Sequence, residues 1–322
     1  ASIRAEVPLT IGISTDKACA PENIYGYSKK MMEQIFIEHH NDKTKFICTR
    51  FANVAGSRGS VIPFFKSLIN KNQPLKLTSK DMNRLMFSKK ESAELIKYAS
   101  NAFLATKITF INEIANLCEK TGIDVEDISI GIGLDKRIGS RFLRAGPAYG
   151  GSCFPKDTKA IVTTADKFKT NLSVIKSVIK SNTSRSKLLL QKVNEILNNK
   201  ITNKKICFLG VTFKANTDDM RDSSSLQMIP FLSKKGAKIK YYDPTGFKKE
   251  FKKLKNVNFE NSINEAVKEA DLVILHTEWN DFKSINFKKL QPSKNLKIYD
   301  MRNIYSPSKI KSQGFKYFGI GR

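Results

Sequence analysis

The order of apolar and polar residues divides the chain into three regions with different periodicities. In the first region, residues 1–90, the pattern predicts a strand over residues 9–15, a helix over residues 25–40 and a strand over residues 45–54. Residues 55–78 carry no comparable pattern, and we expect a loop-rich stretch there. This alternation of strand and helix is typical of an α/β segment.

The second region, residues 91–200, is predicted to be helical throughout. Apolar residues recur at three- and four-residue spacing from Glu91 until Gly122, where the first helix should end. A glycine-rich loop interrupts the helices in the middle of the region. Further helices are predicted over residues 124–133, from residue 155 onward, and over residues 172–199.

The third region, residues 201–322, returns to short apolar runs separated by polar stretches. Such runs are typical of strands buried on both faces, and we expect helices between the first three of them. The pattern indicates a doubly wound parallel sheet. The predicted strands cover residues 205–213, 238–244, 271–278, 296–302 and 315–321.

Composition narrows the class of protein without changing these elements. The chain has 322 residues, of which 40% are hydrophobic and 27% charged, as in a soluble globular protein of two or three domains. No apolar run reaches the length of a membrane span and no signal peptide is recognisable, so we expect a cytoplasmic protein with no membrane partner. The chain begins at Ala1 rather than at a methionine and reaches a strand-like stretch, "VPLTIGIS", by residue 7, so we expect a segment before Ala1.

The five cysteines are scattered, odd in number and never spaced as Cys-x-x-Cys. This argues against a zinc site and a disulfide framework and favours a reducing compartment. The pair His39–His40 has no metal partner at ligand spacing, so we interpret it as a polar helix end and expect no metal. The cysteines are Cys19, Cys48, Cys118, Cys153 and Cys207.

A formal net charge of +26 raises the question of nucleic-acid binding. The excess is mostly lysine and is spread over every region, and runs such as residues 247–255 carry no aromatic stacking pattern. We therefore interpret the charge as a solvated lysine surface and expect no nucleic-acid partner. Such a surface would still attract a small anion such as a nucleotide sugar.

The loop "GPAYGGSCFPKD", residues 146–157, carries the first candidate chemistry. Pro155 suits the first turn of a helix, which places Cys153 at the helix N-terminus, where the helix dipole favours a thiolate. Asp157 lies one turn further on and could act as a base toward water. The alternative is a buried structural cysteine beside a helix cap, and the local pattern favours neither interpretation.

A second candidate lies on the preceding helix. Lys97 and Asn101 are four residues apart and so share one helix face, where both could donate hydrogen bonds to a developing oxyanion. Taken by itself, the pair is better explained as an exposed polar stripe.

Together these motifs carry a resemblance to a known family. The stretch from "ESAELIKYASNAF" through "GPAYGGSCFPKDTKA" resembles the central segment of the UDP-glucose 6-dehydrogenases. The likeness continues through "ICFLGVTFKANTDDMRDSSS" and "DLVILHTEW" to "YDMRNIYSP" and covers residues 91–322. The resemblance implies an enzyme of polysaccharide biosynthesis that oxidises the C6 alcohol of UDP-glucose twice, with two NAD molecules, to UDP-glucuronate.

The resemblance also implies roles for single residues. Cys153 would attack the C6 aldehyde to form a thiohemiacetal, which becomes a thioester after the second hydride leaves. Lys97 and Asn101 would stabilise the oxyanion, and Asp157 would assist the hydrolytic water. The implied substrate-binding residues are Arg137, which would reach a neighbouring subunit, Phe142, Leu143, Tyr149 and Gly150 around the sugar, and Phe213, Lys214 and Arg302 on the UDP-sugar side of the last domain.

Two further points follow from the resemblance. The central helices form dimer contacts in that family, so a homodimer is expected. The family usually has glycine at the position of Ala148, and this methyl group would weaken sugar binding if the position requires positive φ or close contact.

The first region resembles a different family. "ISTDKACAPENIYGYSKKMMEQ" is similar to the active-site segment of extended short-chain dehydrogenase/reductases, nearest to the nucleotide-sugar 4,6-dehydratases and epimerases. Tyr25 and Lys29 form the Tyr-x-x-x-Lys pair, in which the lysine favours the phenolate. Thr15, Asp16 and Lys17 match the Thr-Asp-Lys motif that such dehydratases use in acid–base steps.

Neither resemblance brings a dinucleotide fingerprint, because no strand is followed by G-x-G-x-x-G and a helix. We therefore expect a partial Rossmann-like segment (residues 1–90), an all-helical central dimerisation domain (91–200) and a doubly wound UDP-binding domain (201–322). The two resemblances meet near residues 86–97, a join of the kind that recombination or sequence misassembly leaves.

The leading hypothesis is a UDP-glucose dehydrogenase that turns over little as this chain, because its NAD-binding domain is not found. The alternatives are a UDP-sugar-binding or oligomerising module without catalysis, and a dehydratase or epimerase fragment.

Overall fold

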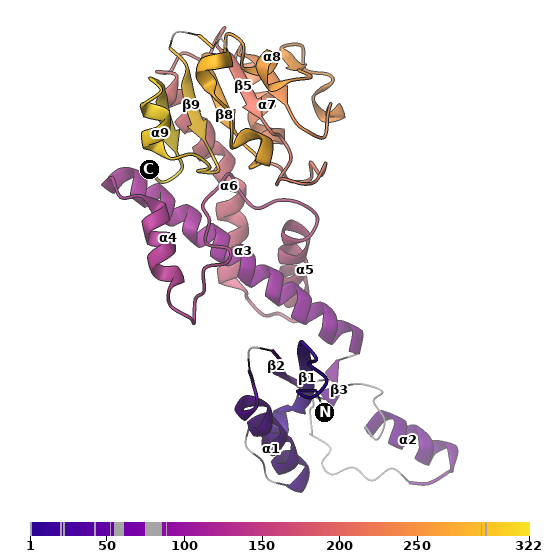
Figure 1. The fold of residues 1–322 in the computed structure, drawn as a ribbon. Helices are drawn as coiled ribbons and strands as arrows, with labels where there is room; N and C mark the ends of the chain where they lie inside the picture. The colour runs from indigo at the N-terminus through magenta and orange to yellow at the C-terminus, as the bar shows by residue number, and fades with distance from the viewer. Residues whose placement is uncertain are drawn as a thin grey trace. The chain divides into compact units, whose positions relative to one another are not determined.

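A computed structural model describes residues 2–19, 21, 23–41, 43–51, 53–54, 61–74, 86–87, 89–290, 292–293 and 295–322 (Figure 1). The chain forms two compact units, residues 1–96 and residues 97–322. The predicted three-domain division at residues 90 and 200 stays a prediction.

The first unit is built on a pair of parallel strands. β1 (Leu9–Thr15) pairs with β2 (Lys45–Phe51) along its whole length. The helix α1 (Ile24–Glu38) packs against both strands, and its Phe36 ring meets Phe46 edge to face with centroids 5.0 Å apart. These elements confirm the strand and helix predicted from the sequence. The unit also contains η1 (Asp16–Ala18), β3 (Asn53–Val54), which pairs with β4 (Met86–Phe87), and α2 (Val61–Asn70).

The prediction of a loop over residues 55–78 is wrong in its central part. The helix α2 occupies residues 61–70, and residues 55–60 and 75–78 lie outside the described part of the chain. The sequence "VIPFFKSLIN" places Pro63 within the first turn, where proline is compatible with a helix. The glycine and serine residues just before the segment obscured its helical character.

The second unit begins within a long helix. α3 (Lys89–Thr121) is 33 residues long, enters the second unit at Lys97, and is followed by Gly122, which has a φ of +74°. The carboxylate of Asp124 then accepts a hydrogen bond from the Glu126 amide and starts the next helix. The remaining helices of this region are α4 (Val125–Gly133), α5 (Phe154–Lys167) and α6 (Ser173–Ile196), as the periodicity predicted.

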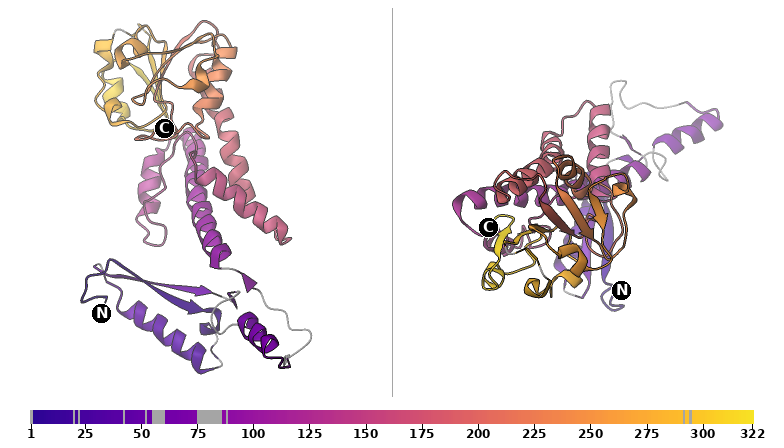
Figure 2. Two further views of the ribbon diagram at one scale, coloured as in Figure 1. Left: turned by 90° about the vertical axis from the view of Figure 1, so that its right-hand side faces the viewer. Right: turned by 90° about the horizontal axis from the view of Figure 1, so that it is seen from above.

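A six-stranded parallel sheet completes the second unit (Figure 2). Its order is β10-β9-β8-β5-β6-β7, so the chain starts in the middle, builds one half outward, returns and builds the other half. The doubly wound sheet is therefore confirmed. The strands are β5 (Lys205–Leu209), β6 (Lys238–Tyr242), β7 (Val257–Phe259), β8 (Leu272–Leu275), β9 (Lys297–Asp300) and β10 (Lys316–Gly319).

The sequence missed β7, which has three residues and carries the polar Asn258 at its centre. Helices lie between the first strands, as predicted. The connecting elements are α7 (Ser225–Lys234), η2 (Lys249–Phe251), α8 (Ile263–Val267), η3 (Asn280–Phe282), η4 (Phe287–Leu290) and α9 (Pro307–Lys311).

One core joins the helices to the sheet in this unit. Ile111 of α3 and Val193 of α6 are fully buried in the same cluster as Phe208 of β5 and Tyr299 of β9. On the opposite sheet face, Leu209 packs in a separate cluster with α8. The strands are buried on both faces, which explains their near-continuous apolar sequences. Among the described residues, no helix combines the length and apolarity needed to cross a membrane.

Candidate active site

The carboxyl ends of β5 and β8 mark the crevice where a doubly wound sheet binds its ligands. These two strands lie side by side at the point where the strand order reverses, so their following loops diverge. Residues 210–214 follow β5, residues 276–278 follow β8, and Arg302 follows β9. The predicted ligand residues Phe213, Lys214 and Arg302 therefore lie at the same, carboxyl edge of the sheet.

Arg302 holds the loops of this crevice together. Its Nε donates to the carbonyl of His276 at 2.9 Å and lies 2.9 Å from Glu278 Oε2. Its Nη2 donates to the carbonyl of Phe213 at 2.7 Å. Burial lowers the pKa of Arg302, because desolvation disfavours the cation. Much of its donor capacity is thus spent on the protein itself.

Cys153 stands at the N-terminus of α5, as the sequence predicted. It is the N-cap residue, Pro155 lies in the first turn, and the Asp157 amide donates to the Cys153 carbonyl at 2.8 Å. The thiol is exposed, whereas Cys118 and Cys207 are buried. The interpretation of Cys153 as a buried structural cysteine is therefore wrong.

Asp157 is the point on which the other polar groups converge. Its side chain is fully buried, and its Oδ2 accepts a hydrogen bond from Asn101 Nδ2 at 2.6 Å. Lys97 Nζ lies 3.8 Å from the same oxygen, and Lys156 Nζ lies 3.6 Å from Oδ1. Within the described part of the chain, Oδ1 accepts no hydrogen bond. The structure thus joins the two candidate motifs into one cluster.

The glycines of the cysteine loop fit tightly against the loops beyond β5. A Cβ atom at Gly150 would lie 2.6 Å from the Asp222 carbonyl oxygen. Gly151 has a φ of +80°, and a Cβ there would lie 2.5 Å from the Phe213 ring. The Gly151 amide also donates to the Arg221 carbonyl at 2.8 Å. The loop that carries Cys153 is therefore anchored to the segments that follow β5.

The predicted sugar-lining residues differ in exposure. Leu143 and Tyr149 are only 2% and 5% exposed, whereas Phe142 is 40% exposed. Asn182 clamps the Tyr149 backbone, accepting from its amide at 2.9 Å and donating to its carbonyl at 3.0 Å. Burial raises the pKa of the Tyr149 phenol. Leu143 and Tyr149 thus shape the loop from inside, and Phe142 is the ring that faces solvent.

Two further sequence expectations can be located. Ala148 does not have a positive φ, so backbone strain gives no reason against alanine there. Arg137 is highly exposed after α4 and forms an ion pair with Asp135 at 2.6 Å. Its reach into a neighbouring subunit stays a prediction.

The first unit gathers the second set of candidates. Lys29 Nζ lies 5.9 Å and Lys17 Nζ 6.0 Å from the centroid of the exposed Tyr25 ring. Lys29 also donates to the Ile13 carbonyl at 2.9 Å. Thr15 ends β1 and Asp16 begins η1, so the motif lies at the carboxyl end of β1; the side chain of Asp16 lies outside the described atoms.

The sequence missed the residues that hold the start of the cysteine loop. Arg185 of α6 is only 4% exposed and donates from Nε to the Gly146 carbonyl at 2.7 Å, and Asn112 Oδ1 accepts from the Gly146 amide at 2.8 Å. Burial lowers the pKa of Arg185 to about 10. A charged residue four positions before the buried Leu189, on an apolar helix face, was the signal available.

The ends of β5 and β6 in the six-stranded sheet do not fit a dinucleotide cofactor. One glycine, Gly210, follows β5, and a Cβ there would already lie 2.5 Å from Thr277. Asp243 ends β6, where dinucleotide folds place the acid that binds ribose. Here Asp243 is buried and accepts hydrogen bonds from the amides of Val211 and Thr245 at 2.8 and 3.0 Å. NAD is implied by the resemblance alone, and we derive no hydride step for these residues.

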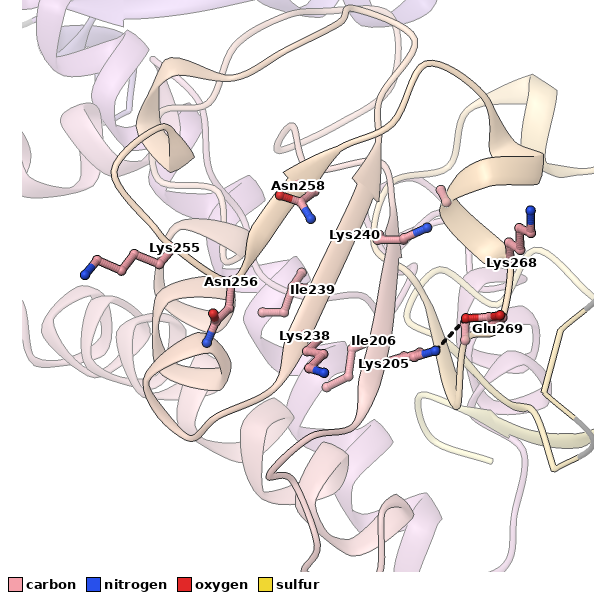
Figure 3. Close-up of a pocket in the computed structure, with 12 residues that line it drawn as sticks. Lys205, Ile206, Lys238, Ile239, Lys240, Lys255, Asn256, Asn258, Lys268 and Glu269 are labelled. Carbon is pink, nitrogen blue, oxygen red and sulfur yellow. Dashed lines mark hydrogen bonds and ion pairs between the residues drawn. The ribbon is translucent and has the colours of Figure 1, made fainter.

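Another hollow, of about 300 Å³, lies at the opposite, amino-terminal ends of β5 and β6 (Figure 3). Five lysines line it, but Lys205 pairs with Glu269 at 2.5 Å and Lys240 with Glu260 at 3.4 Å. We interpret it as part of the lysine-rich surface, since no unpartnered buried group points into it among the described residues.

The fold and site define a class of protein: a helical domain with an exposed thiol, joined to a doubly wound α/β domain. Comparison with known families agrees. The UDP-glucose/GDP-mannose dehydrogenase family matches with its central domain over residues 91–184 and its UDP binding domain over residues 207–307. These matches identify residues 91–184 as a central domain and residues 207–307 as a UDP binding domain of the UDP-glucose/GDP-mannose dehydrogenase family. A family described as "Polysaccharide biosynthesis protein" matches residues 1–123 and overlaps the central-domain match.

Individual relatives show how much of the family the chain covers. It is 46% identical over 239 residues to the UDP-glucose 6-dehydrogenase of Rhizobium meliloti (strain 1021), covering 74% of this chain and 55% of the relative. The UDP-glucose 6-dehydrogenase of Bacillus subtilis (strain 168) is 45% identical over 233 residues, with 72% and 53% covered. The chain thus spans about half the length of the curated relatives it matches.

A solved structure supports the same fold. The NDP-N-acetyl-D-galactosaminuronic acid dehydrogenase from Methanosarcina mazei Go1 superimposes with a TM-score of 0.64 at 27% identity, covering 74% of this chain and 52% of that one.

Proposed function

We propose that the second unit binds a UDP-sugar in the crevice beyond β5 and β8 and presents Cys153 to its C6 atom. This is the role of the thiol-bearing half of a UDP-glucose 6-dehydrogenase. One observation carries the proposal: the exposed Cys153 stands one helical turn from a buried carboxylate that orients Lys97 and Asn101. NAD would be the hydride acceptor, and none of the residues named for this site is assigned to holding it.

The first step assigned to this site is thiol addition. The Cys153 thiolate adds to the C6 aldehyde, so that the S–C6 bond forms and the carbonyl electrons move to oxygen. Asn101 has two amide hydrogens, and one is bound to Asp157 Oδ2, which leaves the other for the oxyanion. The Lys97 ammonium is half-exposed and provides a further donor and the proton that neutralises the adduct.

The second step assigned to this site is thioester hydrolysis. The thioester would form from the thiohemiacetal by loss of the C6 hydride, for which NAD would be the acceptor. Asp157 Oδ1 is buried and accepts no hydrogen bond from the described residues, so it can hold a water molecule. Asp157 takes a proton as the water oxygen bonds to C6, and the C6–S bond breaks to release the carboxylic acid and regenerate the thiolate. Such chemistry needs a free thiol, which the cytoplasm preserves.

We further propose a homodimer through α3 and α4. Phe103, Phe110 and Leu117 are 65%, 49% and 59% exposed and recur every seven residues along α3. Ile130 of α4 and Leu134, the residue just after α4, are 62% and 78% exposed and lie four residues apart. Seven-residue spacing of apolar side chains is the pattern by which one helix packs along another.

The test uses the C6 aldehyde of UDP-glucose with no NAD present. The expected result is binding by calorimetry, together with protection of the Cys153 thiol from iodoacetamide, measured by mass spectrometry. Excess UDP should restore alkylation, and a Cys153→Ser variant should bind the aldehyde without a thiol adduct.

The other outcomes separate the alternatives. Binding of the aldehyde without protection of Cys153 would favour a UDP-sugar-binding module without catalysis. No binding of either UDP or the aldehyde would contradict the proposed function.

A further inference from the structure

His276 is a buried titratable residue at the crevice that the proposed chemistry does not use. It follows β8 directly and is only 1% exposed. Its ring centroid lies 6.5 Å from that of Phe208 in the centre of the sheet. A polar ring in such a place requires hydrogen-bond partners for both nitrogens.

Both ring nitrogens have partners. Nε2 lies 2.8 Å from Ser224 Oγ at the start of α7, and Nδ1 lies 3.1 Å from Thr277 Oγ1. The Thr277 hydroxyl donates its single proton to the Thr212 carbonyl at 2.7 Å. Thr277 must therefore accept from Nδ1–H, and Nε2 must accept from Ser224. One tautomer satisfies the whole chain of hydrogen bonds.

The surroundings keep the imidazole neutral. Burial, with the cationic Arg302 nearby, lowers the pKa of His276 to about 3. Arg302 also donates to the backbone carbonyl of His276 at 2.9 Å. The neutral ring can thus accept at one nitrogen and donate at the other.

This chain of hydrogen bonds ends on the loop that carries the ligand residues. The Thr212 carbonyl is held by Thr277 and the next carbonyl, that of Phe213, by Arg302. The Phe213 ring then packs on Gly151, two residues before Cys153. Lys214 Nζ lies 5.4 Å from the centroid of the same ring. Two successive peptide groups are therefore fixed by residues that follow β8 and β9.

We propose that His276 is a positioning residue, which links the start of α7 to Thr212 through Thr277 and so fixes residues 210–214 in their ligand-binding conformation. The inference rests on the proposed function for the identity of the ligand, the uridine diphosphate part of a UDP-sugar. The holding of the loop is a property of the chain alone.

The test compares variants that remove or keep the link to Thr277. His276→Leu removes both hydrogen bonds, and Thr277→Val removes the link with little change in volume. His276→Asn places an amide nitrogen near the position of Nδ1 and should restore the hydrogen bond to Thr277. We expect the first two variants to weaken UDP-glucose binding on the order of tenfold or more, and His276→Asn by roughly threefold or less.

Two readouts distinguish positioning from general stability. Trp279, the single tryptophan of the chain, is three residues from His276, and its fluorescence is the probe for UDP-glucose binding. Hydrogen exchange of residues 210–214 measures the opening of this loop without ligand. In the His276→Leu and Thr277→Val variants the exchange of these residues should become faster, whereas the exchange of β6 and α6 should not change. If the His276→Leu variant fails to fold, the Thr277→Val variant alone tests the inference.

Unchanged affinity and unchanged exchange in Thr277→Val would overturn the inference. If the unaltered chain does not bind UDP-glucose, the proposed function fails. Faster exchange of residues 210–214 in the variants would then still support the positioning role, and unchanged exchange would overturn it.

Discussion

At the scale of single residues, the site depends on close contacts between side chains that come from different elements. Asp157 collects a hydrogen bond from Asn101 and two ammonium groups within 3.8 Å. Gly151 admits the Phe213 ring where any larger residue would collide with it. The contact with the Phe213 ring makes Gly151 a direct test of the structure, and the two hydrogen bonds of the buried imidazole make His276 another.

Gly151→Ala should destabilise the second unit more than Gly122→Ala. Both glycines have positive φ, +80° and +74°, so both alanines should cost about 1 kcal/mol in backbone strain. At Gly122 a Cβ meets nothing within 4 Å, whereas at Gly151 it lies 2.5 Å from the Phe213 ring. Overpacking should add about 1–3 kcal/mol at Gly151, measured by urea unfolding.

The clash has its own control. Phe213→Ala removes the ring, so Gly151→Ala should cost much less in that background, and the double-mutant cycle should give a clear coupling energy. Equal costs for Gly151→Ala with and without the Phe213 ring would contradict the packing described.

His276 should make folding sensitive to acid. Its pKa falls from 6.5 to about 3 on folding, so the unfolded chain binds more protons between these values and stability decreases as the pH falls below about 6.5. At pH 5 the loss from this group should be about 2 kcal/mol relative to pH 7. In His276→Asn this contribution is absent.

The measurement is urea unfolding at pH 7 and pH 5, followed by Trp279 fluorescence. The stability advantage of the unaltered chain over the His276→Asn variant should shrink or reverse at pH 5, because only the unaltered chain contains the buried neutral histidine. The contributions of the other titrating groups cancel in this comparison. An advantage of the same size at both pH values would show that His276 is not held neutral by burial.

At the scale of elements, helix α3 serves two surfaces. One face contributes Ile111 and Ala115 to the core shared with the sheet, and Asn101 to the Asp157 cluster. Another face carries the exposed Phe103, Phe110 and Leu117. A long amphipathic helix of this kind can contribute to the site with one face and to the proposed homodimer contact with the other.

Phe110→Lys should convert the proposed homodimer to a monomer. A buried, unpaired lysine in each of two facing helices would cost several kcal/mol of association free energy. Light scattering after size-exclusion chromatography measures the mass. Phe168→Lys, at a residue 71% exposed beyond the end of α5, is the matched control and should leave the mass unchanged. A monomeric unaltered chain would contradict the proposed dimer.

At the scale of the whole molecule, the two units differ in how completely they bury their apolar surface. The second unit has fully buried clusters on both faces of a six-stranded sheet. In the first unit, β1 and β2 form a two-stranded sheet, and Leu9, Ile11, Ile13 and Ile47 are 47%, 53%, 56% and 46% exposed. A two-stranded sheet with an open apolar face has marginal stability.

Limited trypsin digestion should therefore cleave the first unit before the second. Mass spectrometry should show a protected product that includes α4 to β10 while cuts accumulate within residues 1–96, because local opening there costs less free energy. A high density of lysines throughout the chain makes cleavage sites available in both units. Equal protection of the two units would contradict this difference in stability.

The sequence by itself determined the helices α3 to α6, most strands of the doubly wound sheet and the helix N-terminus at Cys153. These features follow from local periodicity, proline and glycine, which act over a few residues. Local patterns were insufficient for β7 and α2, because one is very short and the other adjoins a glycine- and serine-rich stretch.

Only the tertiary structure decided which side chains meet. Asn101 and Asp157 are 56 residues apart, and Thr212 and Thr277 are 65 apart, so no spacing rule relates them. The order of the strands brings β5 beside β8, and close packing at Gly151 brings Phe213 to the cysteine loop. Contacts of this kind arise from burial of the shared core, which depends on the whole unit rather than on any one segment.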